Sequence, residues 1–364
     1  MNRAHIIRMY PTEAQIVLLK KTIGAVRYAY NWGLEQWNKQ YQEFKEGKRD
    51  SKPTAFTLMK EWAKLKPEWA FEVAMKPQQR AFINLGIAWS NFFKKLTDKP
   101  KFHKRGMGDS FYCPNDTVKW FPGNKISIPG IGRVKLAENL RFEGKIMSYT
   151  VSTYADEWYV SVAMEVPEAI VNIPDSVCGI DVGLENHPAY ASDGTQLVLP
   201  LEKLHKLQRK LKRAQKALSR SQRNSRNRNK RLIKKQKVQQ KINNIRSDAA
   251  HKFTTKVCKS HATIVIEDLD IQGMIKKAKY KAIKRAFNSS LMSSIHCQLS
   301  YKAKKLIKVP RFFPSSKTCS HCGAIKSELD PSIRIYKCPH CGLEIDRDLN
   351  AALNLMKLGR VKSE

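Results

Sequence analysis

The feature that most constrains this chain is a pair of Cys-x-x-Cys motifs near its C-terminal end, Cys319/Cys322 and Cys338/Cys341. Four thiolates at this spacing form a closed tetrahedral shell around Zn²⁺. Gly323 and Gly342 directly follow the two pairs and allow each knuckle to turn. A shell of four protein ligands leaves no position for a substrate, so the expected zinc is structural. The sequence therefore predicts a zinc ribbon, which we place at residues 311–344.

The net charge indicates the kind of partner. The 364 residues include 67 Lys and Arg against 32 Asp and Glu, a formal net charge of +35 at pH 7. This excess indicates a polyanionic partner, with nucleic acid as the first candidate and an acidic membrane surface as the rival. Because no apolar run has the length of a spanning helix and no signal peptide opens the sequence, we expect no membrane partner and a cytoplasmic location. The other cysteines stand singly in apolar surroundings and are expected to be buried thiols in a reducing compartment: Cys113, Cys178, Cys258 and Cys297.

Residues 11–96 have the periodicity of helices. Thr12 and Gln15 have the spacing of a capping box, which predicts a helix start, and apolar residues then recur every three or four positions as far as Tyr41. Two further helices are predicted near residues 56–65 and 77–96. Because the aromatic residues follow the helical period, we interpret them as the core of a small helical bundle, in preference to a base-stacking role.

Residues 1–10 and 97–173 flank this bundle and have the pattern of strands. Short alternating runs such as EWYVSVAMEV are separated by Gly and Pro, which predicts antiparallel strands closing into a small β-barrel. Since the first strand, residues 4–9, precedes the helices, the bundle is expected to be inserted into the barrel. The basic loop near residues 101–105 is a candidate phosphate contact.

The next unit begins at residue 174 and combines short strands with basic helices. Strands are predicted at VCGIDVG (177–183) and at residues 189–191 and 262–267, followed by a loop through Gly273 and a basic helix over about 280–306. Residues 201–250 contain 18 Lys and Arg against two acidic residues and have the apolar seams of a helical hairpin. Charged helix faces are usually just solvated, but this excess would repel itself without a counter-charge. We therefore expect the hairpin to bind phosphates.

Three carboxylates need a separate explanation. Asp181 and Glu267 lie in apolar strands, and Asp348 lies at the expected start of a helix. A single carboxylate of this kind would be explained by a turn cap or an ion pair with the abundant Lys and Arg. Three that converge from two strands and a helix would form a hard oxygen site suited to Mg²⁺ or Mn²⁺. Two such ions can activate water and stabilise the leaving oxygen of a phosphodiester, so the pattern favours a nuclease.

The order of these motifs resembles the TnpB proteins of bacterial insertion sequences, which are compact relatives of type V CRISPR effectors. The resemblance is carried by GIDVGL, by IVIEDLDIQGM and, most specifically, by the cysteine pairs with the DRDLNAALNL that follows them. N-terminal segments such as YPTEAQ extend it over essentially the whole chain. It implies an α+β multidomain protein with a RuvC-like nuclease domain of the RNase H fold. That domain would comprise residues 174–310 and 345–364, with the zinc ribbon inserted and the barrel and bundle in front.

Carried over by position, the resemblance implies that Asp181, Glu267 and Asp348 are the catalytic, metal-binding carboxylates, and it leaves Asp346 a helix-capping or supporting role. The implied partners are a guide RNA, bound by one protein monomer, and a target double-stranded DNA cut beside a short flanking motif. Base pairing would then read the sequence while the protein holds the backbone. The implied location is the bacterial cytoplasm, at the nucleoid when the protein is on DNA.

Two departures from the family pattern and three other functions have to be considered. Pro188 interrupts a strand, which indicates an edge position or a bulge, and the short link before VPRFFPSS is expected to trim a sheet-edge strand. The alternatives are a guide-dependent DNA-binding protein that does not cut, a protein that joins DNA ends or assists transposition, and a basic zinc-ribbon binder without enzymatic activity. Non-cutting relatives lose active-site acids, whereas all three are present here. A ribbon binder leaves the carboxylates unexplained.

Overall fold

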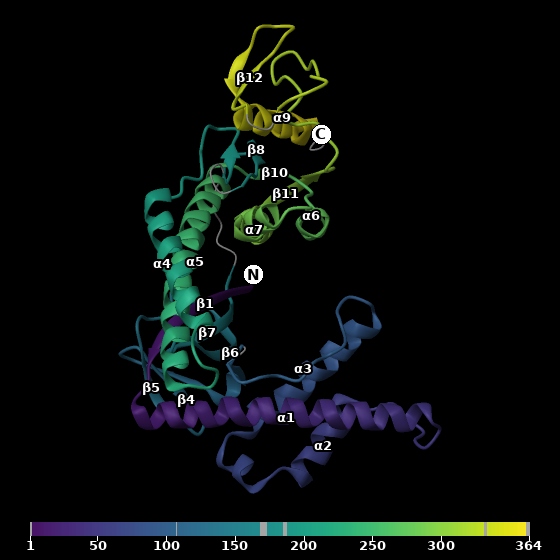
Figure 1. The fold of residues 1–364 in the computed structure, drawn as a ribbon, viewed down its shortest axis with the longest axis vertical. Helices are drawn as coiled ribbons and strands as arrows, with labels where there is room; N and C mark the ends of the chain where they lie inside the picture. The colour runs from purple at the N-terminus through teal and green to yellow at the C-terminus, as the bar shows by residue number, and fades with distance from the viewer. Residues whose placement is uncertain (1, 107, 168–172, 185–187, 331–332, 362–364) are drawn as a thin grey trace. The chain divides into compact units, whose positions relative to one another are not determined.

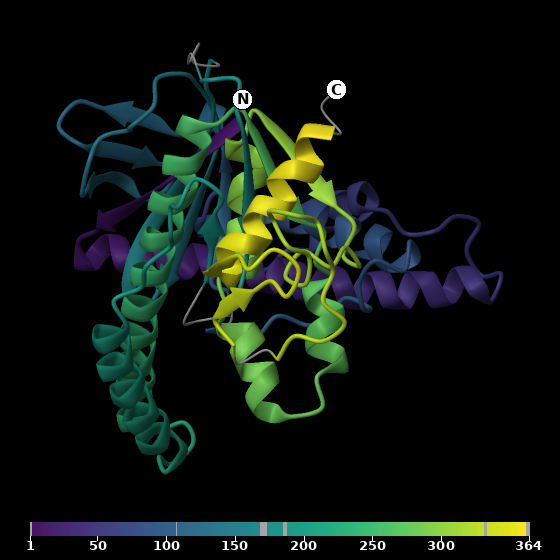
Figure 2. The same ribbon diagram turned by 90° about the horizontal axis from the view of Figure 1, so that it is seen from above.

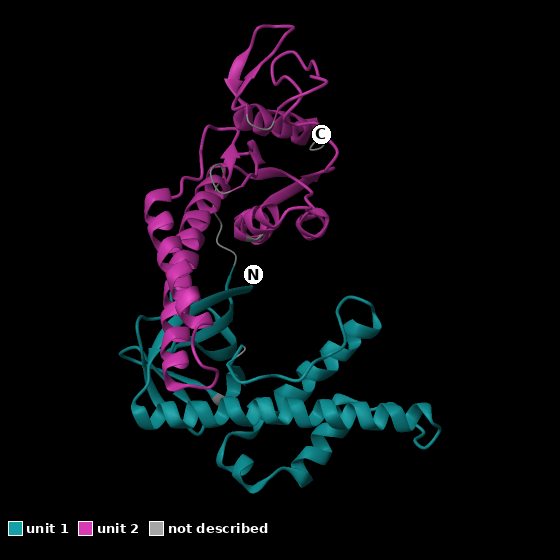
Figure 3. Cartoon of the chain, in the orientation of Figure 1, with its two compact units in different colours: residues 1–169 teal, residues 170–364 magenta. Residues whose placement is uncertain are grey.

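The computed structural model describes residues 2–106, 108–167, 173–184, 188–330 and 333–361. The chain divides into two compact units, residues 1–169 and residues 170–364 (Figure 3). Each unit has buried hydrophobic clusters of its own. Among the described residues, no helix combines the length and the apolar character needed to cross a bilayer.

The first unit contains a seven-stranded antiparallel sheet. Its order is β2 (Ser110–Pro114), β6 (Lys145–Tyr154), β7 (Glu157–Glu165), β1 (Asn2–Tyr10), β5 (Gly132–Leu136), β4 (Lys125–Ile128) and β3 (Lys119–Phe121). Within the described ranges no ladder joins β2 to β3, so the sheet is open and the expected closed barrel is wrong. Pro114 has no N–H to donate and ends β2, and the short 3₁₀ turn η2 (Asn115–Thr117) separates it from a β3 of only three residues.

Three helices pack together in the same unit: α1 (Glu13–Lys45), α2 (Ala55–Leu65) and α3 (Met75–Phe93), with a 3₁₀ turn η1 (Glu68–Glu72) before α3. The capping box of Thr12 and Gln15 is confirmed, and Thr54 and Thr57 form a second one at the start of α2. The third helix starts two residues earlier and ends three earlier than predicted. The aromatic core is confirmed, because one buried cluster contains Trp37, Trp62, Phe82 and Trp89.

The second unit is built on a four-stranded sheet in the order β11 (Lys305–Val309), β10 (Thr263–Glu267), β8 (Val177–Asp181) and β9 (Tyr190–Ala191). β10 is parallel to β8 and β11, whereas β9 is antiparallel to β8. Pro188 lies two residues before the edge strand β9 and outside the strand itself, so the proline does not interrupt a ladder among the described residues. The expected trimming of the other edge is wrong, because β11 pairs with all five residues of β10.

Two long helices, α4 (Leu201–Ser219) and α5 (Arg226–Ser260), lie side by side as the predicted basic hairpin (Figures 1 and 2). The predicted single helix over 280–306 is wrong: α7 (Lys281–Ser289) and α8 (Met292–Lys302) are separate. The hydroxyls of Ser289 and Ser290 donate to backbone carbonyls at the end of α7, which competes with the helical ladder. The expected loop through Gly273 is a short helix, α6 (Ile271–Lys277), capped by Asp270. Cys297 is exposed on α8, contrary to expectation, while Cys113, Cys178 and Cys258 are buried.

The chain ends with the hairpin of β12 (Ile335–Lys337) and β13 (Glu344–Asp346) and with helix α9 (Arg347–Val361), which packs on β8 and β10. Two glycines allow this close packing. A Cβ on Gly179 of β8 would lie 2.1 Å from the carbonyl oxygen of Ala352, and one on Gly359 of α9 would lie 2.2 Å from a methyl of Val265. The absence of these side chains therefore sets how closely α9 approaches the sheet.

Candidate functional site

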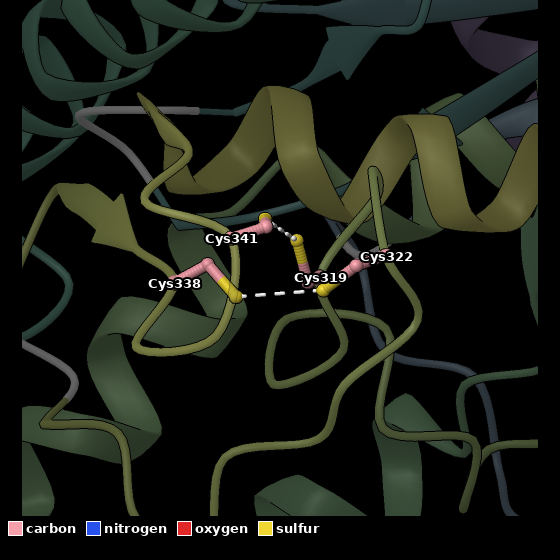
Figure 4. A group of neighbouring side chains, drawn as sticks. All are labelled: Cys319, Cys322, Cys338 and Cys341. Atoms are coloured by element: carbon pink, nitrogen blue, oxygen red, sulfur yellow. Dashed lines mark hydrogen bonds between the residues drawn. The ribbon is translucent and has the colours of Figure 1, made fainter.

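The four cysteines predicted to bind zinc come together as a cluster (Figure 4). Their ligand atoms all lie within 4.8 Å of one another, and the sulfurs of Cys319 and Cys341, and of Cys322 and Cys338, are 3.6 Å apart. Zn–S bonds of about 2.3 Å at tetrahedral angles require sulfur separations of about 3.8 Å, so the cluster fits this ion.

The two cysteine knuckles share one backbone geometry. The N–H of Gly323 donates to the carbonyl of Cys319 at 3.0 Å, and the N–H of Gly342 donates to that of Cys338 at 3.1 Å. Both glycines have positive φ, 77° and 74°, a conformation that L side chains rarely adopt. The repeated turn aims both thiols of each pair at one point, as a structural zinc site requires.

Asp181 and Glu267 lie at the same edge of the sheet. They are the last residues of β8 and β10, which are parallel neighbours, and the register pairs Ile266 with Ile180 directly before them. Parallel strands bring their carboxyl ends to one edge, where α/β proteins commonly place functional groups. Both strands are almost wholly apolar up to these carboxylates, so burial of the strands carries the acids to the edge of the core.

The third carboxylate, Asp348, comes from the first turn of α9 and is 8% exposed. Asp346 accepts hydrogen bonds from the backbone N–H groups of Asp348 (2.9 Å) and Leu349 (3.1 Å), so its helix-capping role is confirmed. Arg334 and Arg347 contact Asp348 at 3.4 and 3.5 Å and partly neutralise it.

The electrostatics show that the other two acids act on Asp181. Burial raises the pKa of Asp181 to about 7, and the negative charges of Asp348 and Glu267 contribute to this rise, while Arg347 opposes it. Burial also raises the pKa of Glu267, against a hydrogen bond from Ser315 that lowers it. A buried carboxylate whose pKa is raised by two acidic neighbours is typical of functional sites, and a bound cation would favour its ionised form.

The donor set fits a hard divalent cation. Carboxylate oxygens are the ligands that Mg²⁺ and Mn²⁺ prefer, and no thiol or imidazole is part of this group. Among the described residues, the carboxylates are not gathered within 4.8 Å as the cysteines are. A site for two ions has to be wider than a single tetrahedral shell.

Sequence reasoning missed the residues that support this site. Arg347 lies inside the DRD motif, so its charge next to Asp348 could have been considered from the sequence. Ser315 was not predictable in this role, because 48 residues separate it from Glu267, to which its hydroxyl donates at 2.5 Å.

A basic groove lies between α4 and α5. It combines an apolar floor with a row of lysines: Leu207, Ile233 and Val238 with Lys210, Lys230, Lys234, Lys237 and Lys241. Lysines along an elongated surface of this kind suit the phosphate backbone of a nucleic acid, as the hairpin's charge predicts.

Comparison with protein families assigns three parts of the chain. Residues 159–278 match the OrfB_IS605 family, described as "Probable transposase", and residues 289–355 match the Cas12f1-like TNB domain. Residues 1–46 match a helix-turn-helix domain of the same OrfB_IS605 group, although the described part of this segment is one strand and one continuous helix.

Relatives of nearly full length agree with this assignment. A Streptomyces pristinaespiralis protein named "Putative RNA-guided DNA endonuclease" is 31% identical, covering 100% of this chain and 90% of its own. The Escherichia coli K12 protein "Putative RNA-guided DNA endonuclease InsQ" is 29% identical, covering 98% of this chain and 92% of its own. The chain belongs to the TnpB family, OrfB_IS605.

Solved structures show the same fold. The Cas12f1 chain of a complex with single guide RNA and target DNA matches with a TM-score of 0.58 at 15% identity, covering 94% of this chain and 82% of that one. A CRISPR-Cas_phi3 mini-RNA-guided endonuclease matches with a TM-score of 0.50 at 10% identity, covering 98% of this chain and 92% of that one.

Proposed function

We propose that this protein is an RNA-guided, Mg²⁺-dependent DNA endonuclease encoded by a transposable element. It cuts DNA complementary to its bound guide RNA beside a short flanking motif. The observation that carries the proposal is that Asp181 and Glu267 end neighbouring parallel strands and that Asp348 is near enough for its charge to act on Asp181. The names of the nearly full-length relatives support the same activity.

The three carboxylates are the proposed ligands of the catalytic ions in a RuvC-like site of the RNase H fold. Bound Mg²⁺ or Mn²⁺ would polarise the attacking water and stabilise the leaving oxygen. Asp181 has to give up a proton to act as a ligand, because its pKa is about 7. Arg334 and Arg347 hold Asp348 in place, and Asp346 fixes the helix start that presents it.

Recognition is divided between nucleic acid and protein. Base pairing with the guide selects the target, and the lysines of the α4–α5 groove bind phosphates without reading sequence. We assign residues 1–10 and 97–173 to a wedge-like sheet domain and residues 11–96 to a recognition bundle. One protein monomer is proposed to bind each guide RNA. The place of action is the bacterial cytoplasm.

The test uses the full-length chain expressed together with the downstream sequence of its own element. RNA that co-purifies is sequenced, and Mg²⁺-dependent cleavage of a DNA library matching that RNA is measured. We expect one discrete RNA and guided cutting, which also reveals the flanking motif. Asp181→Ala and Glu267→Ala should abolish cutting and leave binding intact, whereas Asp98→Ala, at an exposed position, should cut normally.

Other outcomes would select another function. A discrete RNA with guided binding but no cutting by the wild-type protein would indicate a nuclease-inactive DNA-binding protein. Heterogeneous RNA without guided activity would leave a basic zinc-ribbon binder. Cutting by Asp181→Ala at the wild-type rate would refute the assigned site.

A further inference from the structure

A short segment at the start of the zinc ribbon, residues 315–320, contacts three functional elements at once. Ser315 is 3% exposed, and its hydroxyl donates to Oε1 of Glu267 at 2.5 Å. Four residues later, Cys319 is the first thiol of the zinc cluster. The segment therefore joins one of the proposed catalytic carboxylates to the first zinc ligand.

The same segment is hydrogen-bonded to α9, the helix that begins with Arg347 and Asp348. The side-chain amide of Asn354 donates to the backbone carbonyls of Ser315 (2.8 Å) and Thr318 (2.7 Å). Asn350 donates to the same Thr318 carbonyl at 2.7 Å and accepts from the N–H of Ser320 at 2.8 Å.

These hydrogen bonds join buried polar groups. Both amide protons of Asn354 are donated, and the Thr318 carbonyl accepts two bonds, one for each lone pair. Asn350 is 0% and Asn354 is 4% exposed, so any group left unpaired here would remain buried. The arrangement is rigid because moving any of these groups would break a buried hydrogen bond that water cannot replace.

We propose that Ser315 and Asn354 are positioning residues that tie the zinc ribbon to the carboxylate site. Ser315 orients Glu267 through its hydroxyl, and Asn354 holds the Ser315–Thr318 backbone against the helix that presents Asp348. The ribbon thereby fixes the separation of the two acids, and loss of either residue disturbs this separation. This inference rests on the proposed nuclease function.

Variants of Ser315 and Asn354 test the two parts of the proposal separately, the orientation of Glu267 and the tie to α9. Ser315→Ala removes only the bond to Glu267, and Ser315→Thr keeps a hydroxyl there. The neighbouring Ser316→Ala is the matched control, because Ser316 is half-buried and, among the described residues, shows no side-chain hydrogen bond. Asn354→Ala removes two of the hydrogen bonds that tie the segment to α9, keeps those of Asn350 and leaves the Ser315 hydroxyl in place.

The first experiment measures cleavage by the full ribonucleoprotein. For Ser315→Ala we expect unchanged zinc content and DNA affinity. Its single-turnover cleavage rate should fall about tenfold or more at limiting Mg²⁺, with recovery at high Mg²⁺, because supporting partners of metal ligands typically change metal affinity or activity about 10- to 100-fold. Ser315→Thr should recover most of the rate, and Ser316→Ala should match the wild type.

The second experiment measures the release of zinc to a coloured chelator and needs no activity. Asn354→Ala should release zinc about tenfold faster than Ser316→Ala, because two buried hydrogen bonds near Cys319 are lost.

Wild-type zinc release by Asn354→Ala would refute the tie, and a wild-type Mg²⁺ dependence of Ser315→Ala would refute the orientation of Glu267. A parallel loss of DNA binding in Ser315→Ala would show a merely structural role. A wild-type protein that does not cut at all would instead refute the proposed function.

Discussion

The raised pKa of Asp181 has a measurable consequence for stability. Its folded-state pKa of about 7 stands against an ordinary value of 3.8, so the folded protein binds this proton more tightly than the unfolded chain does. The contribution of this proton to the free energy of unfolding is therefore fully present at low pH and is lost as the pH rises from about 4 to 7. A shift of about three pKa units corresponds to about 4 kcal/mol, an upper limit because Asp181 keeps some accessible surface.

Asp181→Asn imitates the protonated side chain and removes this pH dependence. Relative to the wild type, the variant should gain about 2–3 kcal/mol of unfolding free energy between pH 5 and pH 8. In a unit of this size such a gain raises Tm by roughly 5–10 °C. Added Mg²⁺ should stabilise the wild type but not the variant, because an ion bound by Asp181 takes over the role of the proton.

The assay is thermal unfolding of the zinc-loaded protein at several pH values, with and without Mg²⁺ and without chelators. Asp98→Asn is the matched control, because Asp98 is highly exposed and should leave the pH profile unchanged. A stability difference between Asp181→Asn and the wild type that does not vary with pH would refute the reasoning. A variant less stable than the wild type at pH 8 would refute it equally.

Three further predictions concern the ribbon, the hairpin and the packing of α9. Cys338→Ser should lose zinc and unfold the ribbon, as metal analysis and circular dichroism would show, whereas the exposed Cys297→Ser should keep its zinc. A second variant replaces four lysines of the α4–α5 groove by Gln: Lys230, Lys234, Lys237 and Lys241. The slope of log affinity against log salt should become less steep by about 3, and an unchanged slope would exclude phosphate contacts in the groove. Gly179→Ala should lower stability by about 3 kcal/mol and reduce cutting, because its methyl group meets α9. In Gly24→Ala the methyl meets nothing within 4 Å, so stability should rise by about 0.5–1 kcal/mol; equal denaturation midpoints for the two variants would contradict this account.

The sequence by itself determined the features that depend on neighbouring residues. The capping box of Thr12 and Gln15 is local, so the start of α1 could be predicted. The Cys-x-x-Cys spacing is local too, and its combination with the acidic motif that follows is specific enough to identify the family. The apolar strands that end in Asp181 and Glu267 were also recognisable, because their hydrophobic runs are continuous.

Only the tertiary structure decided which distant groups meet. Closure of the first sheet depended on whether β2 and β3 pair, and no local pattern reports on that. The short link before VPRFFPSS did not shorten β11, because all five residues of β11 pair with β10. The contacts of Ser315 with Glu267 and with Asn354 span 48 and 39 residues. A serine and an asparagine can pair with many groups, so their partners are chosen by the packing of α9 on the sheet.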